Sequence, residues 1–361
     1  MSFNAKQVTR RTFVGGAGLA IAAGLVACGG KSTTKGGTSG TSSEDRSGNV
    51  YWLNFKPEMD EAIQSLGKKY MEKYPKVKVK IVTAASGTYT QTLTSEMDKQ
   101  GAPTLFVIGN MEGVKTWSDY AMDLKDTAIA KELSTDDYNL TDDSGKLVSI
   151  PYNYEAFGIV ANTELVEKAG HKMDDIKDFN SLKKVVEDIH SRASELGFDA
   201  FVATDMDDSS SWRVTGHLTN IVCYYDSRDA GGWKQAPATI SDKYIPNYKN
   251  LYDLAINNST VAPNALATGG HDPVTEFTGK KAAFIFSGSF NYADIKEGGV
   301  TSTACIPYYC GVQGEEKAGL NCGTENRWAI NDNASEGDKQ ATMDFMVWLV
   351  TDPDAAAAMV A

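Results

Sequence analysis

The chain has 361 residues, 42% of them hydrophobic, and a formal net charge of −12 at pH 7. This length supplies a core for two domains, and the acidic balance makes nucleic acid and anionic lipid poor partners. Sixteen Tyr and six Trp instead indicate a neutral, polar ligand that stacks on aromatic rings.

The N-terminal 28 residues have the pattern of an export signal. Arg10 and Arg11 precede an apolar run from Phe13 to Ala27, which is too short and too rich in Gly to span a membrane as a stable helix. The run ends in Leu25, Val26, Ala27 and Cys28, which resembles a lipobox. We therefore expect a lipoprotein signal peptide over residues 1–28 and lipidation of Cys28, which would anchor the exported protein to the outer face of the cell membrane. TRRTFV also resembles a twin-arginine signal, and Sec export is the alternative.

Residues 29–48 follow this signal and consist mostly of Gly, Ser and Thr, with a few charged residues. No side chain in this segment is suited to a hydrophobic core. We expect a flexible tether between the anchor and the body of the protein.

Strand and helix patterns alternate at the start of the body. We expect strands at Val50–Asn54, Val77–Val82 and Thr104–Ile108, and helices at Glu58–Tyr74 and Tyr89–Lys99. This order predicts a mainly parallel sheet with helices on both faces, in which ligands bind beyond the carboxyl ends of the strands. The loops at those ends cover residues 55–58, 84–89 and 109–112.

Five segments of the body carry a family resemblance. The stretch GKLVSIPYNYEAFGIVANTELVEKAG (Gly145 to Gly170) resembles the hinge region of the maltose-binding-protein-like extracellular solute-binding proteins (family 1) of carbohydrate ABC importers. Further similar segments follow the same order and spacing as in that family: YWLNFKPEMDEAIQSLGKKYMEKYPKVKVKI, QTLTSEMDKQGAPTLFVIGN, FTGKKAAFIFSGSF and DKQATMDFMVWLVTDPDAA. The resemblance covers nearly all of residues 49–361. One departure is Ala161, where the family usually has Tyr.

The resemblance implies a periplasmic-binding-protein-like fold, with two α/β lobes joined by a hinge and the ligand cleft between them. Lobe 1 would comprise residues 49–153 plus 326–361, and lobe 2 residues 154–325, with further C-terminal helices expected after Ala361. Such a protein captures a sugar or oligosaccharide by hinge closure and delivers it to the permease subunits of an ABC importer. We therefore expect a carbohydrate ligand, no enzymatic activity, no cofactor and a monomer.

A sugar site needs aromatic rings that cover apolar C–H faces, and carboxylates or amides that hydrogen-bond to hydroxyl groups. Loop positions supply both kinds of side chain. Trp212, for example, stands in the polar run DSSSWRVTG, where a large ring has little structural reason to be. The candidate ligand-binding residues are Phe55, Tyr89, Asn110, Glu112, Tyr154, Glu155, Trp212, Ser287, Phe290, Glu325, Asn326 and Trp328. The alternatives are a place in the core for each ring, a solvated charge for Glu112 and a plain turn around Ser287.

The cysteines and histidines leave one possibility open. Cys310 and Cys322 flank a turn at residues 314–317, so a hairpin could join them in a disulfide, with free thiols as the alternative. The four histidines are scattered and no CxxC pair occurs, so we expect no metal site.

Two other functions remain compatible with these features. One is a surface-anchored glycoside hydrolase in which Glu155 and Glu325 form the catalytic carboxylate pair. The other is the same fold binding a non-sugar solute such as a peptide or a polyamine. The sequence contains no P-loop, GxSxG or HExxH motif, so ATP hydrolysis and the common hydrolase chemistries find no support.

Overall fold

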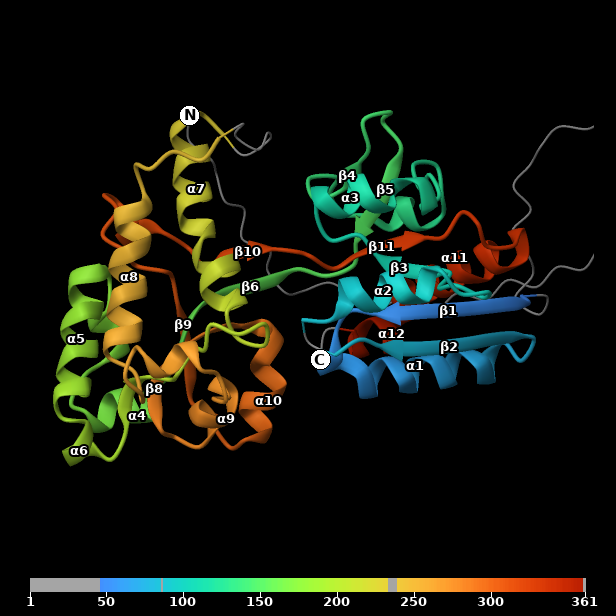
Figure 1. Ribbon diagram of the computed structural model, residues 1–361. Coiled ribbons are helices and arrows are strands. Elements are labelled where there is room, and N and C mark those ends of the chain that lie inside the picture. The colour runs from blue at the N-terminus through green and yellow to red at the C-terminus, as the bar shows by residue number, and fades with distance from the viewer. Residues whose placement is uncertain (1–45, 86, 233–238, 360–361) are drawn as a thin grey trace, which may run out of the picture. The chain divides into compact units, whose positions relative to one another are not determined.

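The computed structural model describes residues 46–85, 87–232 and 239–359, and its strands form two separate sheets (Figure 1). The first sheet contains β1 (Gly48–Asn54), β2 (Val77–Thr83), β3 (Leu105–Val107), β4 (Leu140–Thr141), β5 (Leu147–Pro151) and β11 (Arg327–Ile330). Their order across the sheet is β2-β1-β3-β11-β5-β4. The second sheet contains β6 (Glu155–Asn162), β7 (Asp199–Phe201), β8 (Ala282–Gly288), β9 (Thr303–Ile306) and β10 (Asn321–Gly323). Its order is β10-β6-β8-β7, and β9 also pairs with β6.

Helices cover both faces of the first sheet, as the sequence predicts. The helices that belong to it are α1 (Asp60–Lys73), α2 (Tyr89–Met97), α3 (Met111–Trp117), α11 (Glu336–Thr351) and α12 (Pro353–Ala358). In β1, Trp52 packs with α1 and α11, whereas the next residue, Leu53, packs with α2 and α3 on the opposite face. Because successive side chains of a strand point to opposite faces, the uninterrupted apolar run of β1 is what a doubly covered strand requires.

The second sheet has its own core. Its helices are α4 (Thr163–Lys168), α5 (Phe179–Ser191), α6 (Ala193–Leu196), α7 (Asn220–Asp229), α8 (Ile245–Asn257), α9 (Pro273–Thr278) and α10 (Tyr292–Glu297). All seven residues of β8 are buried, and successive residues face different clusters: Phe284 packs with residues of α5 and α8, and Ile285 with residues of α9 and α10. Two sheets, each with its own hydrophobic core, give the two-lobe α/β architecture that the sequence predicts.

The expectation of mainly parallel sheets is wrong. Strands β1, β2 and β3 are parallel, as their βαβ order predicts, and β7 is parallel to β8. The six other strand pairings of the described residues are antiparallel. Local βαβ patterns predict only the strands they connect. The chain returns to the first sheet at β11 from the second sheet, so β11 runs opposite to its neighbours.

The boundaries of the first elements differ slightly from the predicted ones. Helix α1 starts at Asp60 because Pro57–Met59 forms a 3-10 turn, and α2 ends at Met97. Strand β1 begins at Gly48, inside the segment predicted to be a tether, and Arg46 donates a hydrogen bond to the Tyr70 hydroxyl over 3.4 Å. The predicted signal peptide, lipobox and most of the tether lie outside the described residues.

No helix among the described residues is long and apolar enough to cross a membrane.

Candidate functional site

The chain passes between the two sheets at two crossovers. The first crossover, residues 152–154, joins β5 to β6, and the second, residues 324–326, joins β10 to β11. The two lie side by side, because the backbone N–H of Tyr152 donates to the carbonyl of Asn326 over 3.1 Å. Candidate residues on both segments are therefore brought together although about 170 residues separate them in the sequence.

A buried lysine organises the carboxylates beside the first crossover. Lys56, which follows β1, is 4% exposed, and its Nζ donates to the carboxylate of Glu155 and forms an ion pair with Glu58. Sequence reasoning missed Lys56, although it stands between the candidate Phe55 and Glu58, in a loop already expected to meet the ligand. A buried ammonium between two carboxylates fixes their positions, since breaking such a pair leaves an uncompensated charge.

Glu325 on the second crossover belongs to the same electrostatic group. Desolvation by the surrounding protein raises its pKa, although part of its side chain remains exposed, and the negative charge of Glu155 raises the pKa further. The positive charges of Arg327 and Lys56 partly offset this rise. The predicted carboxylates Glu155 and Glu325 therefore do interact. Glu155 is the first residue of strand β6.

Two of the candidate rings near β1 have different environments. Tyr89 is 8% exposed, and its hydroxyl accepts a hydrogen bond from the Val107 N–H over 2.7 Å and donates to the Leu53 carbonyl over 3.3 Å. Burial raises the pKa of Tyr89. Phe55 is half-buried and meets Tyr89 edge to face, with centroids 5.2 Å apart. Tyr89 thus holds strands together in the core, and Phe55 is the ring that keeps exposed surface.

Asn110 and Glu112 lie at the start of α3. The Asn110 side chain caps this helix by accepting a hydrogen bond from the Gly113 N–H over 2.9 Å. The Glu112 side chain is 80% exposed and forms a 3.6 Å ion pair with Lys115. A local structural role accounts for both residues: a helix cap for Asn110 and a solvated charge for Glu112.

An aromatic cluster lies on the second lobe, and Trp212 is at its centre. The Trp212 ring centroid is 5.0 Å from that of His217 and 5.5 Å from that of Phe290, and His217 stacks on Phe157 at 4.2 Å. We call Phe157, Trp212, His217 and Phe290 the aromatic cluster. Trp212 is half-buried, and its indole N–H donates to the Ser209 carbonyl over 2.8 Å. Of the sequence candidates, the cluster contains Trp212 and Phe290.

A π-helix places His217 beside Trp212. Residues Arg213–Leu218 form this helix, and π-helical turns occur frequently at functional sites. Burial, together with the smaller effect of the Arg213 charge, lowers the pKa of His217 to about 4, so the ring is neutral at physiological pH. Sequence reasoning missed His217 and Phe157. The five-residue spacing from Trp212 to His217 fits a π-helical turn, whereas sequence reasoning treated this polar run as a loop.

Arg213 supports one face of the Trp212 ring. Arg213 is 4% exposed, its Nε donates to the Phe286 carbonyl over 3.1 Å, and its guanidinium carbon lies 4.1 Å from the Trp212 ring centroid. Burial lowers the pKa of this guanidinium to about 10, so it remains charged at neutral pH. A cation–π contact of this kind fixes the plane of the indole.

Ser287 and its neighbour Gly288 end strand β8. The Ser287 hydroxyl is buried and donates to Oδ1 of Asn291 over 2.9 Å. A Cβ atom at Gly288 would lie 2.4 Å from the Ala156 carbonyl oxygen and 2.7 Å from the Phe290 ring. The absence of a side chain at Gly288 therefore lets the Ala156 carbonyl and the Phe290 ring approach closely.

Trp328 and Asn326 are fully buried. Trp328 stacks on Tyr152 with centroids 4.3 Å apart and meets Trp52 edge to face at 5.8 Å. Sequence reasoning gave Trp328 the role of a stacking platform for a ligand, whereas in the structure its partners are core rings. Neither polar atom of the Asn326 side chain has a hydrogen-bond partner among the described residues.

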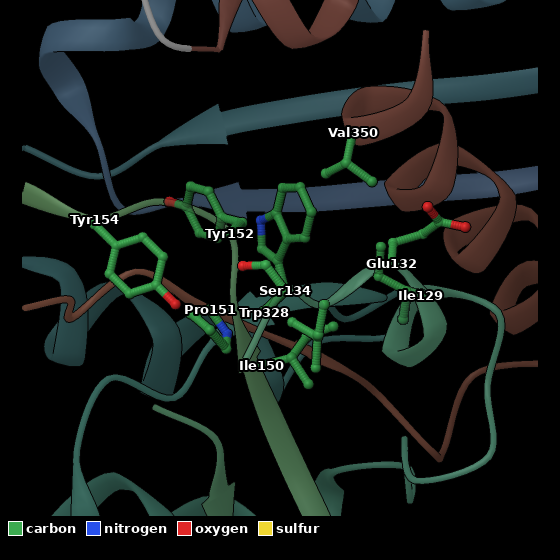
Figure 2. Close-up of a pocket in the computed structure, with 10 residues that line it drawn as sticks. Ile129, Glu132, Ser134, Ile150, Pro151, Tyr152, Tyr154, Trp328 and Val350 are labelled. Atoms are coloured by element: carbon green, nitrogen blue, oxygen red, sulfur yellow. The ribbon is translucent and has the colours of Figure 1, made fainter. Parts of the chain in front are cut away.

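A pocket of about 200 Å³ lies beside Trp328 and the first crossover. Figure 2 shows the Trp328 and Tyr152 rings side by side, with Val350, Glu132 and Ile129 on the side of Trp328 away from Tyr152. Tyr154, which also lines the pocket, is 42% exposed and meets Tyr138 edge to face at 4.9 Å. Tyr154 and Trp328 are thus the two predicted site residues that this pocket brings together.

The cysteines in the described residues are all free thiols. Cys310 is buried in the core of the second lobe, where its backbone N–H donates to the Glu315 carboxylate over 2.7 Å, whereas Cys322 is exposed on β10. The disulfide that the sequence suggested between these two residues is therefore not formed in the structure. The described residues also contain no group of three or more His, Cys, Asp or Glu side chains placed to hold a metal ion.

Comparison with known proteins identifies a family. A family model described as bacterial extracellular solute-binding protein matches residues 65–361. No curated protein matches the chain significantly.

Solved structures share the fold at low sequence identity. The SBP RafE in complex with raffinose is 18% identical, with a TM-score of 0.66, and the match covers 86% of this chain and 80% of that one. The GacH receptor of Streptomyces glaucescens, solved unliganded and with acarbose, is 17% identical, with a TM-score of 0.62 and coverage of 87% and 79%. BlMnBP1 from Bifidobacterium animalis subsp. lactis in complex with mannotriose is 16% identical, with a TM-score of 0.64 and coverage of 88% and 76%.

Proposed function

Since this chain belongs to the bacterial extracellular solute-binding protein family, we propose that it captures an oligosaccharide outside the cell and delivers it to the permease of an ABC importer. The aromatic cluster, with carboxylates at the crossovers, is the observation that carries this proposal. Rings and carboxylates together suit a ligand with apolar C–H faces and many hydroxyl groups.

The two lobes would supply different contacts to the ligand. Trp212 and Phe290 would cover the faces of sugar rings from the second lobe. Phe55 from the first lobe, and Tyr154 and Glu325 from the crossovers, would contact the ligand from the other side, together with Glu155 at the start of β6. Glu155 can accept hydrogen bonds from two adjacent hydroxyls, with Lys56 holding its carboxylate in place.

Buried polar atoms without a protein partner support a polar ligand near the crossovers. Such atoms are the Trp52 indole N–H, the Tyr152 hydroxyl, Oδ1 of Asn153, both side-chain atoms of Asn326 and the Trp328 indole N–H. Buried polar groups are nearly always hydrogen-bonded, so this concentration is unusual. Ordered water would satisfy the indole N–H groups of Trp52 and Trp328 in the core. Hydroxyl groups of a sugar would supply partners for the crossover residues Tyr152, Asn153 and Asn326.

Ligand-driven closure of the two lobes is the proposed mechanism. A ligand that contacts both lobes gains its full set of contacts only when they close around it, so it shifts the population toward the closed state. The permease would then recognise the closed form. The ligands of the similar structures, raffinose, acarbose and mannotriose, favour an oligosaccharide over a peptide or polyamine.

Titration calorimetry against a ligand panel tests the ligand class. The panel contains raffinose, acarbose and mannotriose, with a peptide mixture and spermidine as non-sugar controls. We expect saturable heat from at least one oligosaccharide and none from the controls. Binding of a control alone would refute the carbohydrate assignment.

The glycoside hydrolase alternative needs its own experiment, because Glu325 has a raised pKa next to a second carboxylate, as a catalytic acid would. Incubation with fluorescently labelled oligosaccharides, followed by chromatography, detects cleavage. We expect the substrate to be recovered intact. Product formation that is lost in the Glu325→Gln variant would refute a pure binding role.

We also infer that the protein is a monomeric lipoprotein anchored through Cys28. The lipobox and the Gly-, Ser- and Thr-rich segment after it support this inference. Labelled palmitate should enter the protein and fail to enter a Cys28→Ser variant, which should appear in the medium with its ligand binding intact. Light scattering of the purified protein checks the monomeric state.

A further inference from the structure

Six lysines gather at the end of α1 and along β2. They lie within residues 68–80, all six are exposed, and Glu72 is the one acidic residue in that stretch. We call this set the lysine edge: Lys68, Lys69, Lys73, Lys76, Lys78 and Lys80. The chain as a whole has 35 basic and 47 acidic residues, so the charge of the lysine edge is opposite in sign to the net charge of the protein.

The lysine edge flanks the point where the described chain begins. Strand β2 is the edge strand of the first sheet and pairs with β1, with Gly48 opposite Val77. The Gly48 N–H donates to the Lys76 carbonyl over 3.4 Å. Figure 1 shows α1 lying along β1 and β2, so the helix end and the starts of both strands meet at the same side of the sheet.

Four acidic side chains near the lysine edge form ion pairs or hydrogen bonds within the protein. Asp344 pairs with Arg46 at 3.4 Å, Asp352 pairs with Lys73 at 3.0 Å, and Asp338 accepts from the Asn49 N–H at 2.6 Å. On the other side, Glu96 pairs with Lys99 at 2.6 Å and accepts from the Tyr51 hydroxyl. Lys68, Lys69 and Lys78 form no ion pair with any described residue, and the Lys80 ammonium lies 3.7 Å from the Tyr51 ring centroid.

We propose that the lysine edge is a contact surface for anionic lipid headgroups on the outer face of the cell membrane. The net charge of −12 argues against lipid binding only if all charges act together. At physiological salt, charges more than about 8 Å apart are largely screened, so a surface that approaches a membrane responds to its own local charges. The segment that precedes the lysine edge carries the proposed lipid anchor, which would bring this edge close to the bilayer.

The contact would also orient the body of the protein. Lys76 and Lys78 lie at the amino end of β2 and Lys80 lies at its middle, opposite Tyr51, whereas Phe55 and Lys56 follow the carboxyl end of β1. Headgroup contact through the lysine edge would therefore turn the ligand-binding end of the first sheet away from the membrane, toward incoming solutes. Because the attraction is electrostatic, the contact is reversible and weakens with salt.

A vesicle flotation experiment with two matched variants tests the proposal. The full chain, produced without acylation, is mixed with vesicles of phosphatidylcholine alone or of phosphatidylcholine and phosphatidylglycerol in equal parts. One variant carries Lys68→Gln, Lys69→Gln, Lys78→Gln and Lys80→Gln. The control carries Lys183→Gln, Lys184→Gln, Lys249→Gln and Lys296→Gln, which are exposed lysines of the second lobe, so both variants lose the same net charge.

The wild type and the control should bind phosphatidylglycerol vesicles more than phosphatidylcholine vesicles, and less as salt is raised. Each lysine close to an anionic surface contributes about fivefold in partitioning, so the lysine-edge variant should lose at least about tenfold. Equal binding by all three proteins, or equal loss in both variants, would overturn the proposal. Oligosaccharide binding by the lysine-edge variant should be unchanged. A loss of vesicle binding can therefore be distinguished from a failure of the proposed oligosaccharide-binding function.

Discussion

Replacing Trp328 and Trp212 in parallel tests which ring serves the ligand. Trp328 is 0% exposed, with Tyr152 stacked at 4.3 Å and Trp52 edge-on at 5.8 Å. Truncating a buried Trp to Ala costs about 3–5 kcal/mol, and aromatic pairs contribute about 0.5–1.5 kcal/mol beyond their buried area. Trp328→Phe keeps one ring and should lower the free energy of unfolding by about 2 kcal/mol, which a protein of ordinary stability tolerates.

Trp328→Phe and Trp212→Ala should have different effects on ligand binding. Trp328→Phe should leave the dissociation constant for the oligosaccharide within about threefold of the wild-type value, because a core ring touches no ligand. Trp212→Ala should weaken binding at least about tenfold, as expected for an aromatic anchor, while costing only about 1 kcal/mol of stability because Trp212 is half-buried.

Urea unfolding followed by circular dichroism measures the stabilities, and titration calorimetry measures the affinities. Both variants must show one cooperative transition before their affinities are compared. A folded Trp328→Phe protein that no longer binds, together with a Trp212→Ala protein that binds normally, would refute our assignment of both rings.

Three further changes probe the crossovers and the end of β8. Lys56→Met should lower the free energy of unfolding by about 2 kcal/mol in urea titrations, since it leaves Glu155 without its buried partner; an unchanged midpoint would contradict the role of this ion pair. Partial desolvation and the charge of Glu155 raise the pKa of Glu325, so Glu325→Gln should stabilise the protein at pH 7. That gain should disappear as the pH falls below the ordinary glutamate value of 4.5, where the carboxyl is neutral in both the folded and unfolded states; a gain that persists in acid would count against the reasoning. Gly288→Ala should cost about 1–3 kcal/mol and weaken ligand binding, because the added methyl meets the Ala156 carbonyl and the ring that follows β8; thermal melting and calorimetry check both effects.

The predicted elements at the start of the body agree with the structure because their signals are local. The apolar run at residues 50–53 and the helical spacing of Ile63, Leu66 and Tyr70 depend only on which faces are buried. The strand directions elsewhere could not be read in this way. The pairing of β11 with β3 and β5 joins segments far apart in the chain, and no local pattern encodes it.

The candidate site residues also differ in whether local sequence could predict their environment. Trp212 could be selected from sequence because a large ring in a polar run has few local partners, and the structure leaves it half-buried in an aromatic cluster. Trp328 has a similarly polar neighbourhood in sequence, yet strand β11 carries it into the core against Tyr152. The difference arises because Trp328 lies in β11 in the middle of the first sheet, whereas Trp212 lies in no strand and precedes the π-helix of residues 213–218.

By itself, then, the sequence determined the export pattern, the alternation of strands and helices, the family resemblance and the kinds of side chain available to a ligand. Only the tertiary structure decided which side chains are free to meet that ligand. The polar groups of Tyr89, Asn110 and Ser287 form hydrogen bonds within the protein. Lys56 and His217, in contrast, contact candidate site residues or aromatic rings that are distant in sequence. The physical reason is that burial and hydrogen bonding are properties of the assembled fold, and each side chain's partners are chosen by the strands and crossovers around it.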